Sequence, residues 1–213
     1  MPKPAFDSLI FDLDGTLWDS TQPVTHAWNR ALEALGFRRA GLTEEEIAGI
    51  MGLSHDKIFA KIFPETSEAE RERIAEECYR HEIETLKKEG AALYPGVMEG
   101  LPALAKKFPL FLVSNCQASY MDAFFECTGF RKLFKDWECF GNTRQPKGDN
   151  IRAVVQRNKL KSTAYIGDTA GDHLAAEKAG VPYFHMGYGF GSPHRDCLIF
   201  DSFPDLVVFF SHD

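Results

Sequence analysis

Asp12-Leu13-Asp14-Gly15-Thr16 directly follows an apolar run at residues 6–11, and this stretch decides the fold class. Side chains two residues apart in a strand point to the same face. A strand that ends near Asp14 therefore sends both carboxylates into one space at the edge of a sheet. Gly15 allows the backbone to turn sharply at that point. The pattern resembles an enzyme's nucleophile beside its proton donor.

An alternative interpretation is a hairpin, because Asp-Gly between apolar runs is a strong turn signal. A hairpin requires a second strand directly after the turn. Residues 17–23, Leu-Trp-Asp-Ser-Thr-Gln-Pro, instead predict a loop that leads into a helix. The sequence therefore favours a strand, a turn and a helix.

Composition limits the class of protein and its partners. The 213 residues are 44% hydrophobic, enough for one large domain or for a domain with an inserted subdomain. A net charge of −7 repels nucleic acid and anionic membrane surfaces. We expect a soluble cytoplasmic protein, because neither a signal region nor an apolar run of ~20 residues is present. The five cysteines lack Cys-x-x-Cys spacing, so neither a disulfide framework nor a zinc site is predicted.

Two patterns divide the chain. Residues 19–91 are predicted to be helical, with a helix after Pro23, a second capped by Thr43 and a long one over residues 67–89. From residue 93 onward, helices alternate with short apolar strands. Strands are predicted at residues 110–113, 138–140, 164–167 and 182–185, and helices at 97–107, 118–127, around 151–155, and at 171–179, with a closing helix near 203–210.

This alternation predicts an α/β fold, a Rossmann-like parallel sheet with helices on both faces. The helical block then forms an insertion after the first strand. We therefore expect a core domain at residues 1–18 and 92–213, and a helical cap domain at residues 19–91.

Polar residues follow four of the predicted strands, where ligands bind in open parallel sheets. They are Asp12 with Asp14, Ser114 with Asn115, Lys147, and Asp168 with Asp172. Each has an ordinary alternative as a cap, a surface amine or a turn. Together, crowded carboxylates require a cation, and hard oxygen ligands favour Mg²⁺ over zinc. A hydroxyl, a backbone N–H and an ammonium complete a cradle for a phosphoryl group.

The same residues resemble the four motifs of the haloacid dehalogenase superfamily. Residues 12–16 resemble its first motif, Ser114 its second, Lys147 its third and residues 167–172 its fourth, in the family's order. The helical block resembles the C1-type cap of this family. Residues 49–54, Gly-Ile-Met-Gly-Leu-Ser, resemble the cap loop of phosphoglycolate-phosphatase-like members.

The resemblance implies a Mg²⁺-dependent phosphatase for a small, phosphoglycolate-like monoester. Asp12 would attack phosphorus to form an aspartyl-phosphate, and Asp14 would protonate the leaving alcohol and later activate water. The metal would be bound by an Asp12 oxygen, the backbone carbonyl of Asp14 and Asp168, with Asp172 supporting these ligands. Ser114, the backbone N–H of Asn115 and Lys147 would bind the phosphate oxygens.

Three other functions remain open at this point. A dehalogenase would not need an acid at Asp14, because halide leaves without a proton. A β-phosphoglucomutase-like phosphomutase would use the same residues, and a non-catalytic phosphate-binding module would not need Asp12 or Asp14. We expect a small phosphorylated substrate, a monomer or homodimer, and no nucleic-acid or membrane partner. His55 and Arg144 are candidates for substrate selection.

Overall fold

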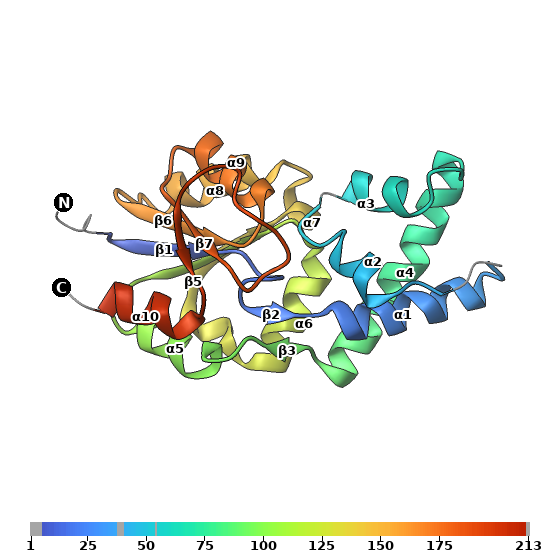
Figure 1. Ribbon diagram of the computed structural model, residues 1–213, viewed down its shortest axis with the longest axis horizontal. Coiled ribbons are helices and arrows are strands. Elements are labelled where there is room, and N and C mark those ends of the chain that lie inside the picture. Colours follow the sequence, from blue (N-terminus) through green and yellow to red (C-terminus); the bar gives the residue numbers. More distant parts are fainter. Residues whose placement is uncertain (1–5, 38–40, 54, 212–213) are drawn as a thin grey trace.

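The computed structural model describes residues 6–37, 41–53 and 55–211. It consists of a sheet flanked by helices and a helical block beyond one end of that sheet (Figure 1). Within these residues, no helix is long and apolar enough to cross a membrane.

The central sheet has six parallel strands in the order β5-β4-β1-β6-β7-β8. Their bounds are β1 Ser8–Phe11, β4 Leu110–Ser114, β5 Phe134–Cys139, β6 Thr163–Gly167, β7 Tyr183–Met186 and β8 Leu198–Phe200. All four residues of β1 are buried, as expected for a central strand that is covered on both faces. The predicted α/β fold with a parallel sheet is confirmed.

Helices cover both faces of the sheet because successive strand residues point to opposite sides. Leu9 and Phe11 of β1 belong to one apolar core, whereas Ile10 belongs to the other. The first core also includes residues of α5 (Val97–Ala105), α6 (Ala118–Thr128) and α10 (Phe203–Ser211). The second includes residues of α8 (Lys147–Arg157) and α9 (Ala170–Ala179). Figure 1 shows these two groups below and above the sheet.

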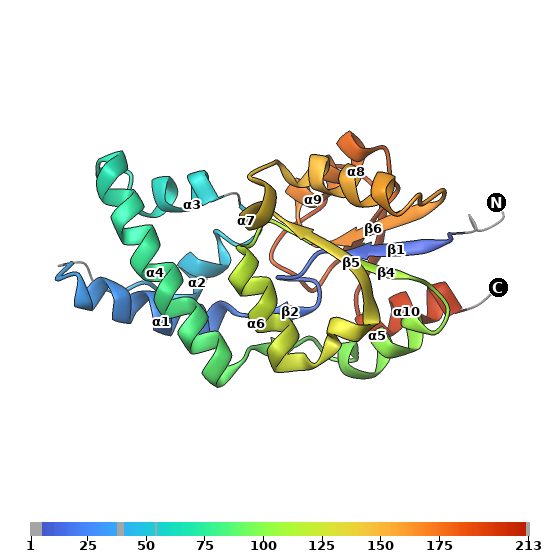
Figure 2. The same ribbon diagram turned by 180° about the vertical axis from the view of Figure 1, so that it is seen from behind.

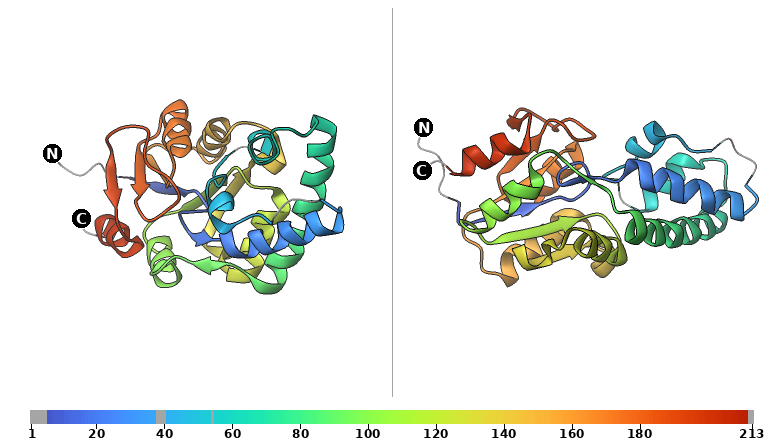
Figure 3. Two further views of the ribbon diagram at one scale, coloured as in Figure 1. Left: turned by 45° about the vertical axis from the view of Figure 1, so that its right-hand side comes forward. Right: turned by 90° about the horizontal axis from the view of Figure 1, so that it is seen from below.

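The helical insertion comprises α1 (Thr21–Ala34), α2 (Glu44–Ala48), α3 (His55–Ile62) and α4 (Glu68–Glu89). The long helices α1 and α4 pack side by side (Figure 3). Trp28 of α1, Phe59 of α3 and Tyr79 of α4 form an aromatic cluster, with ring centroids 5.0 Å apart for Trp28 and Phe59, 6.2 Å for Trp28 and Tyr79, and 5.4 Å for Phe59 and Tyr79. Helix α4 also contacts α6 of the core (Figure 2). The predicted cap at Thr43 is confirmed as a capping box with Glu46.

A small antiparallel pair marks the two points where the chain enters and leaves this insertion. Strand β2 (Trp18–Asp19) pairs with β3 (Ala92–Leu93). Because β2 does not pair with β1, the hairpin alternative for Asp14-Gly15 is excluded. The pair lies at the expected boundaries between core and cap, and the division into these two domains stays a prediction.

Some predicted bounds were wrong. The strand expected at residues 138–140 is β5, which begins at Phe134 and ends at Cys139. It follows a short 3-10 helix, η1 (Phe130–Leu133), and precedes α7 (Phe140–Thr143). The edge strand β8 was not predicted.

Candidate active site

The carboxyl ends of three adjacent strands bring the predicted motif residues together. Asp12 follows β1, Ser114 ends β4 and Asp168 follows β6, and β1 pairs with both of the other strands. Lys147 is the first residue of α8, after β5 and α7. All four side chains are buried.

Lys147 joins two of the carboxylates. Its Nζ lies 3.0 Å from Asp12 Oδ1 and 2.6 Å from Asp172 Oδ1, and the Lys147 side chain is only 5% exposed. Burial alone would lower the pKa of Lys147, but the charges of Asp12 and Asp172 raise that pKa above its ordinary value. The ammonium therefore stays charged in the interior.

Asp172 is held as an anion by several donors. Its Oδ2 accepts hydrogen bonds from the backbone N–H of Asp168 at 3.2 Å, and from the backbone N–H of Thr169 at 3.0 Å and its hydroxyl at 2.7 Å. Burial works toward a higher pKa for Asp172, but Lys147 and these hydrogen bonds lower it below the ordinary value. Thr169 also caps α9, so this anion is fixed at the start of that helix.

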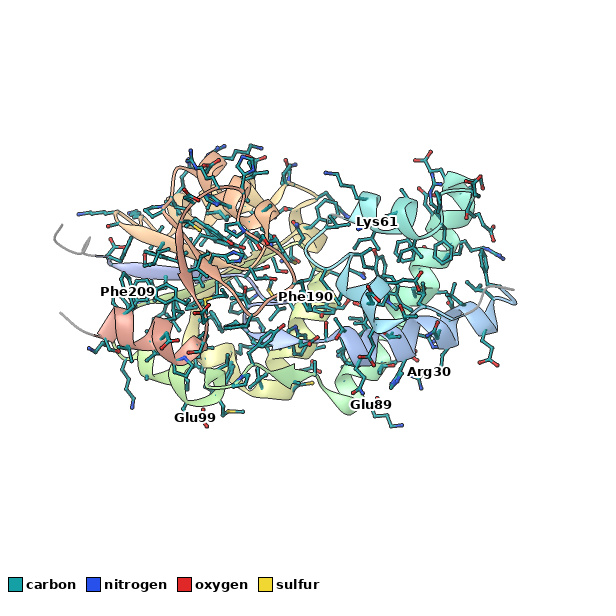
Figure 4. The ribbon with its side chains drawn as sticks, viewed as in Figure 1. Arg30, Lys61, Glu89, Glu99, Phe190 and Phe209 are labelled. Carbon is teal, nitrogen blue, oxygen red and sulfur yellow. The ribbon has the colours of Figure 1, made fainter. Side chains whose placement is uncertain are left out.

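Asp12 and Asp168 are shifted in the opposite direction. Burial and the charge of Asp172 raise the pKa of Asp12 to about 7, and the Lys147 ammonium only partly opposes this shift. Burial and the charges of Asp172 and Asp12 raise the pKa of Asp168 well above its usual range. Asp168 accepts hydrogen bonds from the Thr16 hydroxyl at 3.2 Å and from the backbone N–H of Phe190 at 2.8 Å. Figure 4 shows Phe190 on the side of the sheet that faces the helical insertion.

These carboxylates fit a hard divalent cation. Asp12, Asp168 and Asp172 each offer an oxygen atom, and the three oxygens lie within 4.8 Å of one another. Asp12 Oδ1 is buried and accepts no aligned hydrogen bond from the described residues, although the ammonium of Lys147 lies nearby. Two carboxyls with raised pKa values in one buried cluster are the environment that a cation relieves. The structure therefore contains a candidate metal centre of oxygen ligands.

Glycines allow this cluster to close. Gly15 has φ +80°, and a Cβ at this position would lie 2.1 Å from Asp168 Oδ2. At Gly189 a Cβ would lie 2.3 Å from the Cβ of Asp168. Both backbones approach the Asp168 side chain so closely that a larger residue would displace it.

Asp14 lies in a separate environment from Asp12. Its Oδ1 accepts hydrogen bonds from Trp18 Nε1 at 2.8 Å, from the Ser20 hydroxyl at 2.9 Å and from the Tyr120 hydroxyl. Burial raises the pKa of Asp14, and these three donors only partly oppose that shift. The sequence interpretation missed all three donors. Trp18 and Ser20 follow Asp14 closely along the chain, whereas no sequence signal links Tyr120 of α6 to it.

The second motif connects the core to the insertion. Ser114 Oγ accepts a hydrogen bond from the backbone N–H of Cys116 at 3.3 Å. Asn115 Nδ2 donates to the backbone carbonyl of Gly52 at 2.9 Å. Gly52 belongs to the loop that was predicted to resemble a cap loop, and this bond ties the loop to the end of β4. Ser54 and the side chain of His55 lie outside the described residues.

A small cavity connects Asp12 and Asp14 with the insertion. It has a volume of about 70 Å³, room for a handful of non-hydrogen atoms. Side chains of the core line one part of the cavity, and mainly apolar side chains of the insertion line the other part. The lining residues are Asp12, Asp14, Val24, Trp28, Ile50, Met51, Gly52, Leu53, Ile58, Tyr79, Glu82, Ser114, Asn115, Cys116, Gln117 and Tyr120.

The chain belongs to the haloacid dehalogenase-like hydrolase family, whose model matches residues 9–186. It is similar to a phosphoglycolate phosphatase of Vibrio vulnificus strain YJ016, with 29% identity over 98% of this chain and 94% of the relative. A phosphoglycolate phosphatase of Escherichia coli strain K12 is 27% identical over 85% of this chain and 81% of the relative. The family match assigns the chain to the hydrolases, and these relatives indicate a phosphatase.

Solved structures share the fold at lower identity. A haloacid dehalogenase-like hydrolase from Streptococcus pneumoniae has a TM-score of 0.84 at 22% identity, covering 96% of this chain and 98% of that one. The CbbY protein of Rhodobacter sphaeroides, solved with xylulose 1,5-bisphosphate, has a TM-score of 0.79 at 17% identity, covering 95% and 96%.

Proposed function

We propose that this protein is a Mg²⁺-dependent phosphatase that hydrolyses a small, phosphoglycolate-like phosphomonoester through a phosphorylated Asp12. The observation that carries the proposal is the contrast between Asp12 and Asp14. Asp12 lies beside the Lys147 ammonium in the carboxylate cluster, whereas Asp14 lies apart from it among neutral donors with a raised pKa. Two carboxyls in such different environments suit the roles of nucleophile and acid.

In this mechanism Asp12 attacks the phosphorus atom, and the bond from phosphorus to the ester oxygen breaks. Protonated Asp14 donates its proton to the departing alcohol, and its carboxylate then takes a proton from the water that hydrolyses the aspartyl-phosphate. Trp18, Ser20 and Tyr120 all bind Oδ1 of Asp14, so its other oxygen is available for the proton. Lys147, the Ser114 hydroxyl and the backbone N–H of Asn115 would bind the phosphate oxygens.

The metal would be held by Asp12, Asp168 and the backbone carbonyl of Asp14. When bound, Mg²⁺ neutralises negative charge, so that an anionic nucleophile can approach an anionic phosphate. Asp172 already binds Lys147 and Thr169, and this fits its role of supporting Asp168 from behind. Oxygen ligands without histidine or cysteine favour Mg²⁺ over zinc.

The other functions are less well supported. An acid at Asp14 is unnecessary for a dehalogenase. A phosphomutase remains the strongest alternative because the same residues would serve it, but it must keep water away from the aspartyl-phosphate. The proposed partner is a small phosphorylated molecule, since the cavity is small and lies against Asp12.

The test is phosphate release in ¹⁸O-labelled water. We expect the purified protein to hydrolyse small phosphate esters with Mg²⁺ and to place one labelled oxygen in each released phosphate. Asp12→Asn should reduce turnover below a detectable level, since an amide cannot form the aspartyl-phosphate. Asp122→Asn is the matched control, because Asp122 lies on the exposed face of α6, paired with Arg131.

Two results would overturn the proposal. If Asp12→Asn keeps a tenth of the wild-type activity, Asp12 is not the nucleophile. The second result would be that the protein converts β-glucose 1-phosphate into glucose 6-phosphate faster than it releases phosphate from either ester. It would then be a mutase.

A further inference from the structure

Gln117 has a side-chain amide that the mechanism above does not use. Its Nε2 is buried and has no hydrogen-bond partner in the part of the chain that the structure describes. Gln117 occupies the N-cap position of α6, but its side chain does not cap that helix. It lines the cavity that contains Asp12 and Asp14. Because a buried donor without a partner costs free energy, this amide indicates a ligand that accepts a hydrogen bond in the cavity.

Glu82 of α4 is a second polar group of the cavity that the mechanism does not use. It is 5% exposed and lines the same cavity. Its Oε2 accepts a hydrogen bond from Trp28 Nε1 at 2.6 Å, and Oε1 accepts none from the described residues. None of the described lining residues is a lysine, arginine or histidine, so the cavity wall offers Glu82 no cation.

A buried carboxyl without a cation beside it favours its neutral form. Burial raises the pKa of Glu82 to about 8, the Trp28 hydrogen bond opposes this shift, and the charge of Asp14 adds to it. Because Oε2 accepts from Trp28, the proton of the neutral acid lies on Oε1. Glu82 therefore presents an O–H donor to the cavity.

The two donors lie near the acid that would protonate the leaving alcohol. Gln117 begins α6 of the core and Glu82 belongs to α4 of the insertion, and these two helices pack together (Figure 2). The charge of Asp14 acts on Glu82, and Tyr120, one turn after Gln117, donates a hydrogen bond to Asp14. A leaving alcohol that receives its proton from Asp14 therefore lies within the part of the cavity that both donors line.

We propose that the Gln117 amide and the carboxyl O–H of Glu82 each donate a hydrogen bond to a carboxylate on the leaving alcohol, and so determine specificity for phosphate esters of small hydroxy acids. This inference rests on the proposed phosphatase function and assigns the residues that recognise its phosphoglycolate-like substrate. Hydrogen bonds to an ionised acceptor are stronger than those between neutral groups. The charge of the bound carboxylate also favours the neutral form of Glu82, so the donor is kept when the ligand binds.

Arg144 provides the competing explanation, because a guanidinium is a cation suited to a carboxylate. Arg144 is exposed and does not line the cavity, and its guanidinium lies 5.8 Å from the centroid of the Phe140 ring. Burial raises the pKa of Tyr79 in the cavity wall, and the charge of Arg144 opposes that shift. The field of Arg144 thus reaches the cavity, and a variant of this residue belongs in the test.

Three phosphate esters with leaving groups of similar size test the proposal. 2-Phosphoglycolate carries a carboxylate, isobutyl phosphate carries an isopropyl group in its place, and phosphoethanolamine carries an ammonium. With wild-type enzyme and Mg²⁺, we expect kcat/KM for 2-phosphoglycolate to exceed that for either of the other esters by ~10-fold or more. The ratio of kcat/KM for 2-phosphoglycolate to that for isobutyl phosphate, the carboxylate preference, is compared between variants, because the intrinsic reactivities of the two esters then cancel.

Gln117→Leu removes one donor and nearly keeps the size of the side chain. Because Nε2 has no described partner and the side chain caps no helix, the variant should fold, and a thermal melt checks this. We expect its carboxylate preference to fall ~10-fold or more. Gln156→Leu on the exposed face of α8 is the matched control and should keep the wild-type preference.

Two variants of Glu82 separate its donor from its charge. The amide of Glu82→Gln accepts from Trp28 and donates an N–H in place of the O–H, so its carboxylate preference should stay within ~3-fold of wild type. Glu82→Leu has no donor, and its preference should fall ~10-fold or more. Because Leu leaves Trp28 Nε1 without its acceptor, a thermal melt checks folding, and Gln117→Leu tests the proposal independently. Glu76→Leu, at an exposed position of α4, is the matched control.

The outcomes are distinct. A wild-type enzyme that hydrolyses isobutyl phosphate or phosphoethanolamine at least as well as 2-phosphoglycolate overturns the inference and leaves the proposed function intact. An unchanged carboxylate preference in folded Gln117→Leu also overturns it, and loss of the preference in Arg144→Ala would then assign the carboxylate to Arg144. A preference that rises in Glu82→Gln shows an ionised Glu82 and overturns the inference as well. Release of phosphate from none of the three esters, nor from p-nitrophenyl phosphate, overturns the proposed function itself and the inference with it.

Discussion

At the scale of single residues, the site depends on how the structure separates two acids that lie two positions apart. Asp12 shares a buried cluster with Lys147, Asp168 and Asp172, and its pKa rises to about 7. Asp14 is surrounded by neutral donors, and its pKa also rises because of burial. A cation in the cluster would restore the charge of Asp12 but would affect the more distant Asp14 carboxyl less.

Asp14→Asn should therefore reduce activity according to the leaving group. The amide keeps an oxygen for Trp18 and Ser20, but it cannot donate the proton that an alkyl alcohol needs. We expect a loss of ~10²–10⁴-fold in kcat for an alkyl phosphate, and a smaller loss for p-nitrophenyl phosphate, whose leaving group departs without a proton. Steady-state kinetics on both esters provide the measurement. Equal losses would contradict the role of Asp14 as an acid.

The sequence predicted the residues at the strand ends because parallel strands share one carboxyl edge. Asp12, Ser114, Lys147 and Asp168 meet there as expected. Tyr120 and Glu82 could not be found in this way. Each lies on a helix, and only the packing of that helix against another element brings its polar group to the cavity.

At the scale of elements, buried strands were predicted better than edge strands. The central strands β1, β4 and β6 are apolar runs buried on both faces, which gives a clear signal. The edge strand β5 includes Lys135 and Asp136, and Arg157 pairs with Asp136 at 2.5 Å. Because the first half of β5 is polar, the sequence pattern did not indicate where this strand begins. The other edge strand, β8, is short and follows an irregular stretch at residues 187–197.

The packing of α1 against α4 buries Glu82 of α4, whose Oε2 accepts a hydrogen bond from Trp28 Nε1 of α1 at 2.6 Å. This burial gives a prediction for the stability of the protein. Folding raises the pKa of Glu82 from 4.5 to about 8, because burial disfavours the ionised form. The neutral form of Glu82 therefore stabilises the folded protein fully below pH 4.5. This stabilisation is lost as the pH rises through 8. Glu82→Gln removes this titration. We expect the melting temperature of Glu82→Gln, relative to wild type, to increase between pH 5 and pH 8, by the equivalent of a few kcal/mol at most.

Thermal melts across this pH range, with chelator present, provide the measurement. Glu76→Gln is the control and should follow the wild-type curve at every pH. A constant difference between Glu82→Gln and wild type from pH 5 to pH 8 would show that folding does not raise the pKa of Glu82.

At the scale of the whole molecule, the sheet gathers acids from distant parts of the chain at the edge that faces the insertion (Figure 1). The chain already carries a net charge of −7. Without a cation, this cluster opposes folding, as the raised pKa of Asp168 indicates. The fold therefore contains repulsion that ligand binding relieves, so stability and function are linked through the same residues.

This linkage predicts opposite effects of one substitution. Asp168→Asn removes an acid from the cluster and keeps an oxygen that can accept from the Phe190 N–H, so the metal-free variant should melt above the metal-free wild type. Mg²⁺ at roughly 100 times its Kd should stabilise the wild type by ~2.7 kcal/mol, or ~5–10 °C, and should leave Asp168→Asn nearly unchanged. Melts with Mg²⁺ and with chelator measure both effects, and Asp122→Asn should respond to Mg²⁺ as the wild type does. A full Mg²⁺ response in Asp168→Asn would place the metal elsewhere.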